Sequence, residues 1–206
     1  MEGFFVAQQS HSNYAKTILS VPSTLNMDYV DTFAPGLDDS KFWWLMEPFI
    51  DHSEVRTLLK SQGYQTVSFS TNWSLTDMNS ADIHLAAFPV ELTDFEQYLL
   101  QTTPLRLSQP FLQDSASVFT SETQRRTILH TLGALDDFVS DPDPVFVFAH
   151  ILLPHPPFVL DAEGKPVQSA TDCSLKDAED FEGSSEEYRK GYKGQVEFLN
   201  SRLQEI

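Results

Sequence analysis

The sequence predicts an α/β protein built on a mostly parallel sheet. The apolar run over 145–151 is typical of a strand buried on both faces of such a sheet. Two further short apolar segments, 64–70 and 82–88, alternate with segments whose apolar residues recur at helical spacing. This alternation of helix and strand favours a sheet that is covered by helices on both faces.

The N-terminal part is expected to hold one strand and one helix. Residues 3–7 are apolar and predict a short strand. Pro22 lacks an amide hydrogen, so it fits the first turn of a helix and not its interior. The first helix is therefore expected to begin near Ser20, with Thr17 just before or at its N-terminus.

A helix-to-strand step follows in the next part of the chain. A helix is expected over 53–62, and Gly63 is its expected stop. The strand over 64–70 comes directly after this glycine. The residues of this helix that should face inward are Val55, Leu58 and Leu59.

The C-terminal half alternates in the same way. Helices are expected over 91–101, 122–139 and 184–206, and the last of these opens with Ser184 and Glu187 in a capping box. The segment 159–183 is rich in Asp, Glu, Ser and Gly and predicts a long, solvated surface loop. The apolar stripe expected along the last helix comprises Tyr188, Tyr192, Val196, Leu199 and Leu203.

Length and composition limit the class of protein. A chain of 206 residues is enough for one core, and we expect a single domain over 1–206. The net charge of -17 argues against nucleic acid and anionic membranes as partners. The single cysteine excludes an internal disulfide and a multi-cysteine metal site. No apolar stretch approaches the length of a membrane-spanning helix, and the N-terminus does not resemble a signal peptide.

The first candidate site lies at the start of the first helix. A hydroxyl at a helix N-terminus meets the positive end of the helix dipole and exposed amides, which favour an alkoxide or a bound phosphate. Thr17 is the candidate nucleophile, and Lys16 could add positive charge. The alternative is that Thr17 or Ser20 only caps the helix, which is a common use of these residues.

The second candidate site follows the strand over 145–151. His155 is bracketed by prolines on a stiff turn, and ligands bind beyond the carboxyl ends of parallel strands. An imidazole there can donate a hydrogen bond to an oxyanion or act as acid or base. The alternative is that His155 is an ordinary loop residue and that His150 is a satisfied core residue.

Together these segments resemble the sulfatase-like branch of the alkaline phosphatase superfamily, which includes lipoteichoic acid synthases and phosphoethanolamine transferases. The resemblance rests on the sequence KTILSVP at 16–22, the helix-to-strand step LLKSQGY at 58–64, the turn PHPPF at 154–158 and the tyrosine-rich helix at 188–203. It extends in order from about residue 3 to residue 206.

The resemblance implies a three-layer α/β/α sandwich of the alkaline phosphatase type. It implies metal-dependent hydrolysis or transfer of a phosphate or sulfate ester, either a small molecule or a lipid. Thr17 would be the metal-bound nucleophile, His155 would contact the transferred group and Lys16 would support its charge. The metal would be divalent, with zinc, manganese, magnesium and calcium left open. The family works at the extracytoplasmic face of a membrane.

The same resemblance implies metal ligands that this sequence lacks. The family holds its metal with an acidic residue on a strand upstream of the threonine and an Asp-His pair far downstream. Glu2 is the only acid before Thr17, and Asp51-His52 lies in the wrong order of elements. We therefore expect a partial domain, incomplete at both ends, that associates through unpaired sheet edges. The alternatives are an inactive fragment or pseudoenzyme acting as a binding module, and an unrelated α/β binding protein.

Overall fold

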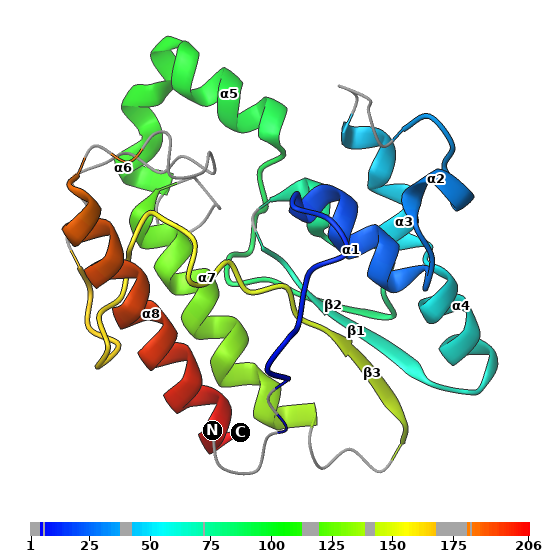
Figure 1. Cartoon of the computed structure of the whole chain (residues 1–206). Helices are drawn as coiled ribbons and strands as arrows, with labels where there is room; N and C mark the ends of the chain where they lie inside the picture. The colour runs from blue at the N-terminus through cyan, green and yellow to red at the C-terminus, as the bar shows by residue number, and fades with distance from the viewer. Residues whose placement is uncertain are drawn as a thin grey trace. The chain divides into compact units, whose positions relative to one another are not determined.

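The computed structural model divides the chain into two compact units (Figure 1). We call Phe5–Leu85 with Asp137–His150 the sheet unit, and Ala86–Asp136 with Ile151–Ile206 the helical unit. The strand expected over 3–7 falls mostly outside the described residues. The structure describes residues 5, 7–37, 43–71, 73–112, 120–138, 143–167, 181 and 183–206.

The sheet unit contains three parallel strands in the order β2-β1-β3. The central strand β1 (Gln65–Phe69) pairs with β2 (Ile83–Leu85) on one side and with β3 (Val145–Phe148) on the other. These strands confirm the expected α/β class and are shorter than the apolar runs that predicted them. β1 is buried from its second residue onward, but all four residues of β3 are only half-buried. The expected full burial of β3 is therefore wrong: among the described strands it pairs only with β1, so its other edge has no strand beside it and its residues stay partly accessible.

Helices of the sheet unit pack on this sheet through a shared apolar cluster. Leu25 of α1 (Thr17–Leu25) and Ile50 of α3 (Pro48–Asp51) meet Phe146 and Phe148 of β3 in that cluster. The remaining helical elements of the unit are α2 (Val30–Phe33), α4 (Glu54–Ser61) and the short 3₁₀ turns η1 (Trp43–Met46) and η2 (Ser74–Thr76).

α1 begins at Thr17 and not near Ser20 as expected. Pro22 lies inside the helix, where its missing amide leaves the carbonyl oxygen four residues earlier without its usual donor. The helix tolerates this loss because its first turn is already closed by bonds from Leu19 and Ser20 to the Lys16 carbonyl oxygen. The ring of Pro22 is buried, so it also contributes apolar contact.

α4 has the expected ends but not the expected inward face. The Ser53 hydroxyl caps it by accepting the amide hydrogen of Arg56, and Gly63 ends it with a φ of +88°, which favours glycine. Leu58, expected to face inward, is 52% exposed, whereas Arg56 is 7% exposed. Hydrogen bonds of the guanidinium group explain why the charged residue takes the inner position.

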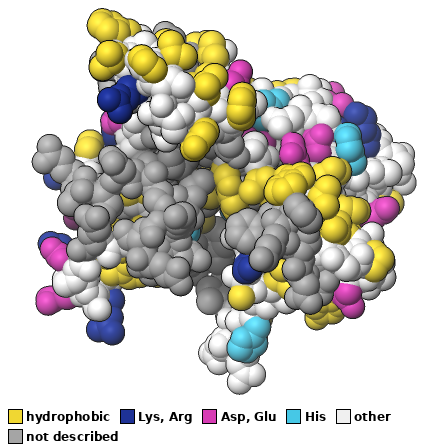
Figure 2. All heavy atoms as spheres, turned by 90° about the horizontal axis from the view of Figure 1, so that it is seen from above, with side chains coloured by type: hydrophobic (Ala, Val, Ile, Leu, Met, Phe, Trp, Pro, Cys, Tyr) yellow, Lys and Arg dark blue, Asp and Glu magenta, His cyan; other side chains and the backbone are white. Residues whose placement is uncertain are grey.

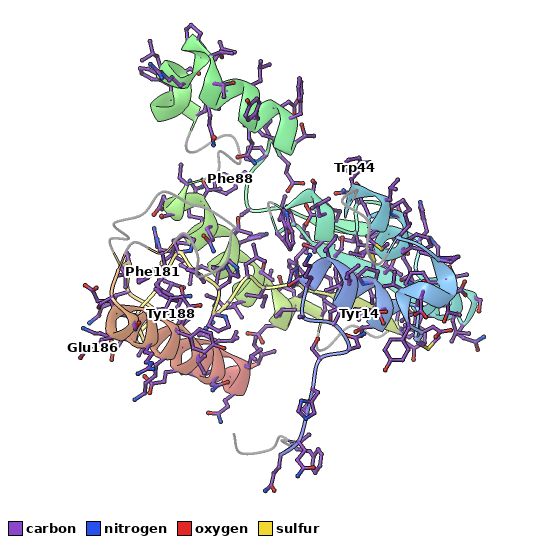
Figure 3. The ribbon with its side chains drawn as sticks, turned by 45° about the horizontal axis from the view of Figure 1, so that its top comes forward. Tyr14, Trp44, Phe88, Phe181, Glu186 and Tyr188 are labelled. Atoms are coloured by element: carbon purple, nitrogen blue, oxygen red, sulfur yellow. The ribbon has the colours of Figure 1, made fainter. Side chains whose placement is uncertain are left out.

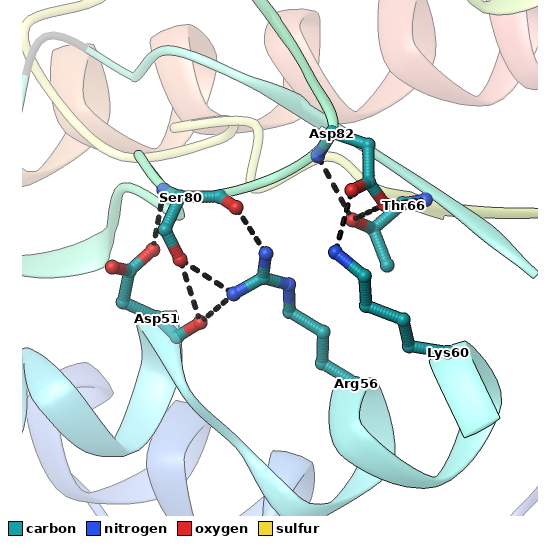
Figure 4. A network of polar contacts seen from close by, with 6 residues as sticks. All are labelled: Asp51, Arg56, Lys60, Thr66, Ser80 and Asp82. Atoms are coloured by element: carbon teal, nitrogen blue, oxygen red, sulfur yellow. Dashed lines mark hydrogen bonds and ion pairs between the residues drawn. The ribbon is translucent and has the colours of Figure 1, made fainter.

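Two pairs of polar contacts join α4 to the segment that leads into β2 (Figure 4). Arg56 Nη1 donates to the Asp51 carbonyl oxygen and to Ser80 Oγ, each at 2.5 Å, and Nη2 donates to the Ser80 carbonyl oxygen. Lys60 Nζ lies 2.6 Å from Asp82 Oδ1. Asp82 Oδ2 accepts both the Thr66 hydroxyl at 2.7 Å and the Thr66 amide at 3.0 Å. The bonds between Asp82 and Thr66 tie the start of β2 to the start of β1.

We expect the contacts of Asp82 to stabilise the fold in a pH-dependent way. The Lys60 ammonium, and then the two Thr66 donors, hold the pKa of Asp82 well below its ordinary value of 3.8. Their stabilisation is present above that ordinary value and is lost as the pH falls below it. Asp82→Asn should therefore lower the free energy of unfolding by about 1–2 kcal/mol at pH 7 and by clearly less at pH 2, because the stabilisation is lost progressively between pH 3.8 and the lowered pKa of the folded state.

Urea denaturation at the two pH values measures this difference, and Lys60→Met with the double variant completes a cycle. If the losses in the free energy of unfolding from the two substitutions are non-additive at pH 7, the pair of Lys60 and Asp82 causes the stabilisation. Equal losses for Asp82→Asn at pH 7 and pH 2 would contradict this explanation.

The helical unit is organised around α7 (Ser121–Ala134) and α8 (Ser185–Glu205). α8 opens with the expected capping box between Ser184 and Glu187. The other elements are α5 (Asp94–Thr102), η3 (Pro104–Ser108), α6 (Gln109–Leu112) and η4 (Leu135–Phe138), which follows α7. Within the described ranges, no helix combines the length and apolar character needed to cross a membrane.

The core of the helical unit includes the start of the segment expected to be a surface loop. Val159 and Leu160 are each 1% exposed and pack with Ile128, Leu132 and Phe198. The surface-loop expectation is therefore wrong for these two residues, because their apolar side chains fill the space between α7 and α8. The acidic residues at 168–180 and 182 lie outside the described part of the chain.

The buried face of α8 also differs from the expected stripe. Gln195 and Phe198 are its buried residues, whereas Tyr192 is 45% exposed. Tyr188 instead joins a cluster of aromatic rings with Phe158 and Phe181. Figure 3 labels Phe181 and Tyr188 at the start of α8. Ring centroids in this cluster lie 5.3–5.6 Å apart with edge-to-face geometry, which is a favourable arrangement.

Candidate functional site

Thr17 is the first residue of α1, and its side chain is exposed. The N-cap residue is Lys16, which has an extended backbone and makes no side-chain capping bond. The Thr17 hydroxyl forms no hydrogen bond with another described residue. The interpretation of Thr17 as a helix cap is therefore wrong, and its hydroxyl faces solvent beside the first amides of α1.

Ser20 is not a cap either, because it lies within the first turns of α1 and is bound by the preceding segment. Its Oγ donates to Asn13 Oδ1 at 2.6 Å and lies 2.9 Å from Ser12 Oγ. Asn13 Nδ2 in turn donates to Ser23 Oγ at 2.7 Å. These bonds hold the incoming chain against one side of α1 and leave Thr17 uncovered.

The start of α1 packs beside η2, which follows the carboxyl end of β1. Ile18 is 4% exposed and lies in an apolar cluster that Leu75 of η2 also contacts. Ile18 is the neighbour of Thr17, and Leu75 is the neighbour of Thr76. The candidate nucleophile therefore starts a helix at the edge of the sheet where parallel α/β proteins bind their ligands.

A group of polar residues lies at this same edge, and of its members sequence reasoning considered only His150, as a core residue. We call Thr71, Thr76, Asp77 and His150 the carboxyl-edge cluster. Asp77 Oδ1 accepts the amide of Thr71 at 2.8 Å and its hydroxyl at 2.7 Å, and Thr76 Oγ1 lies 2.9 Å from His150 Nδ1. The three cluster members between β1 and β2, Thr71, Thr76 and Asp77, are each at most 6% exposed. Their only signal in the sequence is a run of hydroxyl residues directly after an apolar strand.

His150 is neutral at physiological pH. Burial lowers its pKa to about 4, so the uncharged imidazole dominates at pH 7. It is half-buried and bonded to Thr76, which agrees in part with the alternative that it is a satisfied core residue. Only one of its two ring nitrogens is used in that bond.

His155 belongs to the helical unit, whereas Lys16 and Thr17 belong to the sheet unit. His155 Nδ1 lies 2.5 Å from the Pro156 carbonyl oxygen. A carbonyl oxygen can only accept, so Nδ1 carries a hydrogen and the neutral ring has its lone pair on Nε2. The His155 carbonyl oxygen accepts a bond from Gln195 Nε2 at 3.3 Å, which ties the proline turn to α8.

The described residues do not form a metal centre. No group of three or more His, Cys, Asp or Glu side chains comes together among them. Thr17 has no carboxylate or imidazole hydrogen-bonded to its hydroxyl within the described ranges. This part of the chain therefore offers a threonine oxygen for a divalent ion but not the set of ligands that would hold it.

Comparison of the chain with protein-family models, with curated proteins and with solved structures gives no match.

Proposed function

We propose that this protein acts on phosphate or sulfate esters as a hydrolase or transferase, with Thr17 as the nucleophile. The observation that carries the proposal is the exposed Thr17 hydroxyl at the first position of α1, unused in capping. The packing of Ile18 with Leu75, beside the carboxyl edge of a parallel sheet, supports the same assignment. For the whole domain we propose the three-layer sandwich of the alkaline phosphatase type.

In the proposed reaction, Thr17 Oγ attacks the phosphorus or sulfur atom in line with the leaving group. The Oγ–H proton passes to bulk water, the new Oγ–P or Oγ–S bond forms, and the leaving oxygen takes the electron pair of the bond that breaks and a proton from water. Water or an acceptor hydroxyl then attacks the same phosphorus or sulfur atom, which breaks the bond to Oγ and restores the Thr17 hydroxyl with the proton released. The first amides of α1 point along the helix axis towards the non-bridging oxygens of the ester. Lys16, the N-cap residue of α1, adds positive charge beside the nucleophile.

The proposed cofactor is a divalent metal ion, which would make the threonine hydroxyl acidic enough to react at neutral pH. Thr17 is the one ligand that we assign to it. Because the described residues do not form the rest of a metal centre, the step above is written without the ion.

A non-catalytic binding module is a second candidate function, and a specific surface favours it. The helices α5 and η3–α6 expose a row of large apolar side chains, visible at the upper left of Figure 2. Exposed apolar surface of this extent on a folded protein often marks a contact with another molecule. The members of this surface are Phe95, Tyr98, Leu99, Leu105, Leu107 and Phe111, which are 43–84% exposed.

Turnover of nitrophenyl phosphate, bis-nitrophenyl phosphate and nitrophenyl sulfate tests the enzymatic proposal. The protein is assayed with manganese, zinc, magnesium or calcium, and with chelator. We expect metal-dependent turnover that falls by at least about a thousandfold in Thr17→Ala and is partly kept in Thr17→Ser.

Thr24→Ala is the matched control, because Thr24 is exposed on the same helix and its hydroxyl bonds only to the Ser20 carbonyl oxygen at 2.8 Å. This control should retain full activity. Metal-independent turnover that survives Thr17→Ala would overturn the mechanism. Absence of turnover with every metal would favour the binding module.

A further inference from the structure

We propose that His150 is an anion-binding residue of the same site, a neutral hydrogen-bond donor that Thr76 orients towards a non-bridging oxygen of the ester. This inference rests on the proposed function and names a residue that it does not include. The assignment comes from the direction of hydrogen bonds within the carboxyl-edge cluster.

The position of each hydrogen in the cluster follows from the groups that can only accept. The Asp77 carboxylate takes the hydroxyl hydrogen of Thr71, with an oxygen–oxygen distance of 2.7 Å. The Trp73 carbonyl oxygen already accepts the Thr76 amide at 3.0 Å and lies farther from Thr76 Oγ1, at 3.3 Å, than His150 Nδ1 does. Because His150 Nδ1 is the nearer of these two acceptors, at 2.9 Å, we assign the Thr76 hydrogen to it; in the alternative, the Thr76 hydroxyl donates to Trp73 and His150 Nδ1 is the donor.

The assigned direction implies one tautomer of His150, which the experiment below measures. A neutral imidazole that accepts at Nδ1 must carry its hydrogen on Nε2. His150 Nε2 forms no hydrogen bond with another described residue. It is also not among the fully buried side-chain atoms that lack a hydrogen-bond partner. The group left for a ligand is thus an N–H donor at the carboxyl edge of the sheet.

The two histidines then differ in what they offer an anion. His155 uses its Nδ1 hydrogen in the bond to the Pro156 carbonyl oxygen at 2.5 Å. Neutral His150 donates through Nε2 without gaining a proton, and burial keeps it neutral. Its contact with a phosphate or sulfate oxygen is a neutral-to-anion hydrogen bond, stronger than one between two neutral groups.

Thr76 is the positioning residue in this arrangement. It is fully buried, and its neighbour Leu75 packs in the same cluster as Ile18 beside Thr17. The donor of His150 and the nucleophile of α1 are thus fixed by adjacent residues of one short turn. A substitution at Thr76 should change the tautomer and the orientation of the His150 ring without removing a group that contacts the ligand.

Nitrogen NMR of the histidine rings tests this inference in the full chain, with inorganic phosphate and sulfate as probes. We expect the Nε2–H tautomer for His150 at pH 7 and a shift of its ring signals on titration with either ion. Thr76→Val should mix the tautomers and raise the phosphate Kd about tenfold, whereas Thr76→Ser should behave as the original protein. His150→Gln, which keeps a donor near Nε2, should bind phosphate better than His150→Leu.

His84 is the internal control: its Nδ1 lies 2.8 Å from the Ser68 hydroxyl oxygen, which itself donates to the Met78 carbonyl oxygen at 2.7 Å, so this bond lies within the strands and runs from the ring to the hydroxyl. Its signals should not respond to either ion. The inference is overturned if His150 has its hydrogen on Nδ1, or if phosphate binds equally well to Thr76→Val. Loss of turnover in Thr17→Ala combined with an unresponsive His150 would remove this inference alone. A responsive His150 without any turnover would keep the anion site and remove the catalytic proposal.

Discussion

Replacement of Gln195 by methionine is expected to lower the free energy of unfolding of the helical unit by about 2–3 kcal/mol. Gln195 is fully buried on α8. Its Oε1 accepts the amide of Val159 at 3.0 Å, and its Nε2 donates to the His155 carbonyl oxygen at 3.3 Å. Methionine fills a similar volume but leaves a buried amide and a carbonyl oxygen without partners. Urea denaturation of the full chain measures the loss.

The control for this change is Gln204→Met, an exposed position on the same helix that should be nearly neutral. Gln195→Glu separates the two bonds, because it keeps an acceptor for Val159 and removes the donor to His155. The ring signals of His155 should move in both Gln195 variants and stay unchanged in Gln204→Met. Equal stability of the two methionine variants would show that the bonds of Gln195 contribute nothing.

Replacement of Gly191 by alanine is the second change with a large expected effect. A Cβ atom at Gly191 would lie 2.2 Å from Cδ2 and 2.4 Å from Cγ of Phe158. The ring cannot move aside easily, since its edge-to-face contacts with Phe181 and Tyr188 hold it. We expect a net loss of about 1–3 kcal/mol, although alanine is intrinsically the better helix former.

Two other helical glycines provide controls for this prediction. A Cβ at Gly133 of α7 meets nothing within 4 Å, so Gly133→Ala should gain up to about 1 kcal/mol. A Cβ at Gly194 approaches only backbone atoms, the nearest at 3.4 Å, and its substitution should have a small effect. Thermal unfolding of the three variants ranks them. A Gly191 variant as stable as the Gly133 variant would mean that Phe158 repacks freely.

Much of the secondary structure was predictable because it depends on local signals. Apolar runs predicted the three strands, and the pair Ser184 and Glu187 predicted the start of α8. The errors came from tertiary contacts. The start of α1 was misplaced because bonds to Lys16 outweigh the cost of Pro22. Arg56 could not be recognised as buried, because its acceptors come from two separate segments, Asp51 at the end of α3 and Ser80 before β2.

The candidate site was predictable only where a residue carries its own signal. Thr17 stands at the start of a helical pattern, and His155 stands among prolines. The carboxyl-edge cluster has no such signal, since His150 and Thr76 are 74 positions apart in the chain. Gln195 was also missed, because a glutamine within a polar helix gives no indication that it is buried. The sequence therefore indicates candidate groups, whereas the structure supplies the partners that determine their protonation.

The pairing of β1 with β3 has a consequence for how this protein folds. Gln65 is in register with Val145, so the two strands meet only after a chain segment of some eighty residues has closed into a loop. During synthesis β1 and β2 are complete long before β3 leaves the ribosome, and one edge of β1 stays open for that time. When β3 pairs with this edge of β1, His150 comes within hydrogen-bond distance of Thr76. The pairing of β3 therefore also completes the carboxyl-edge cluster. Folding of this sheet should accordingly be slow and governed by chain topology, not by the strength of any local contact.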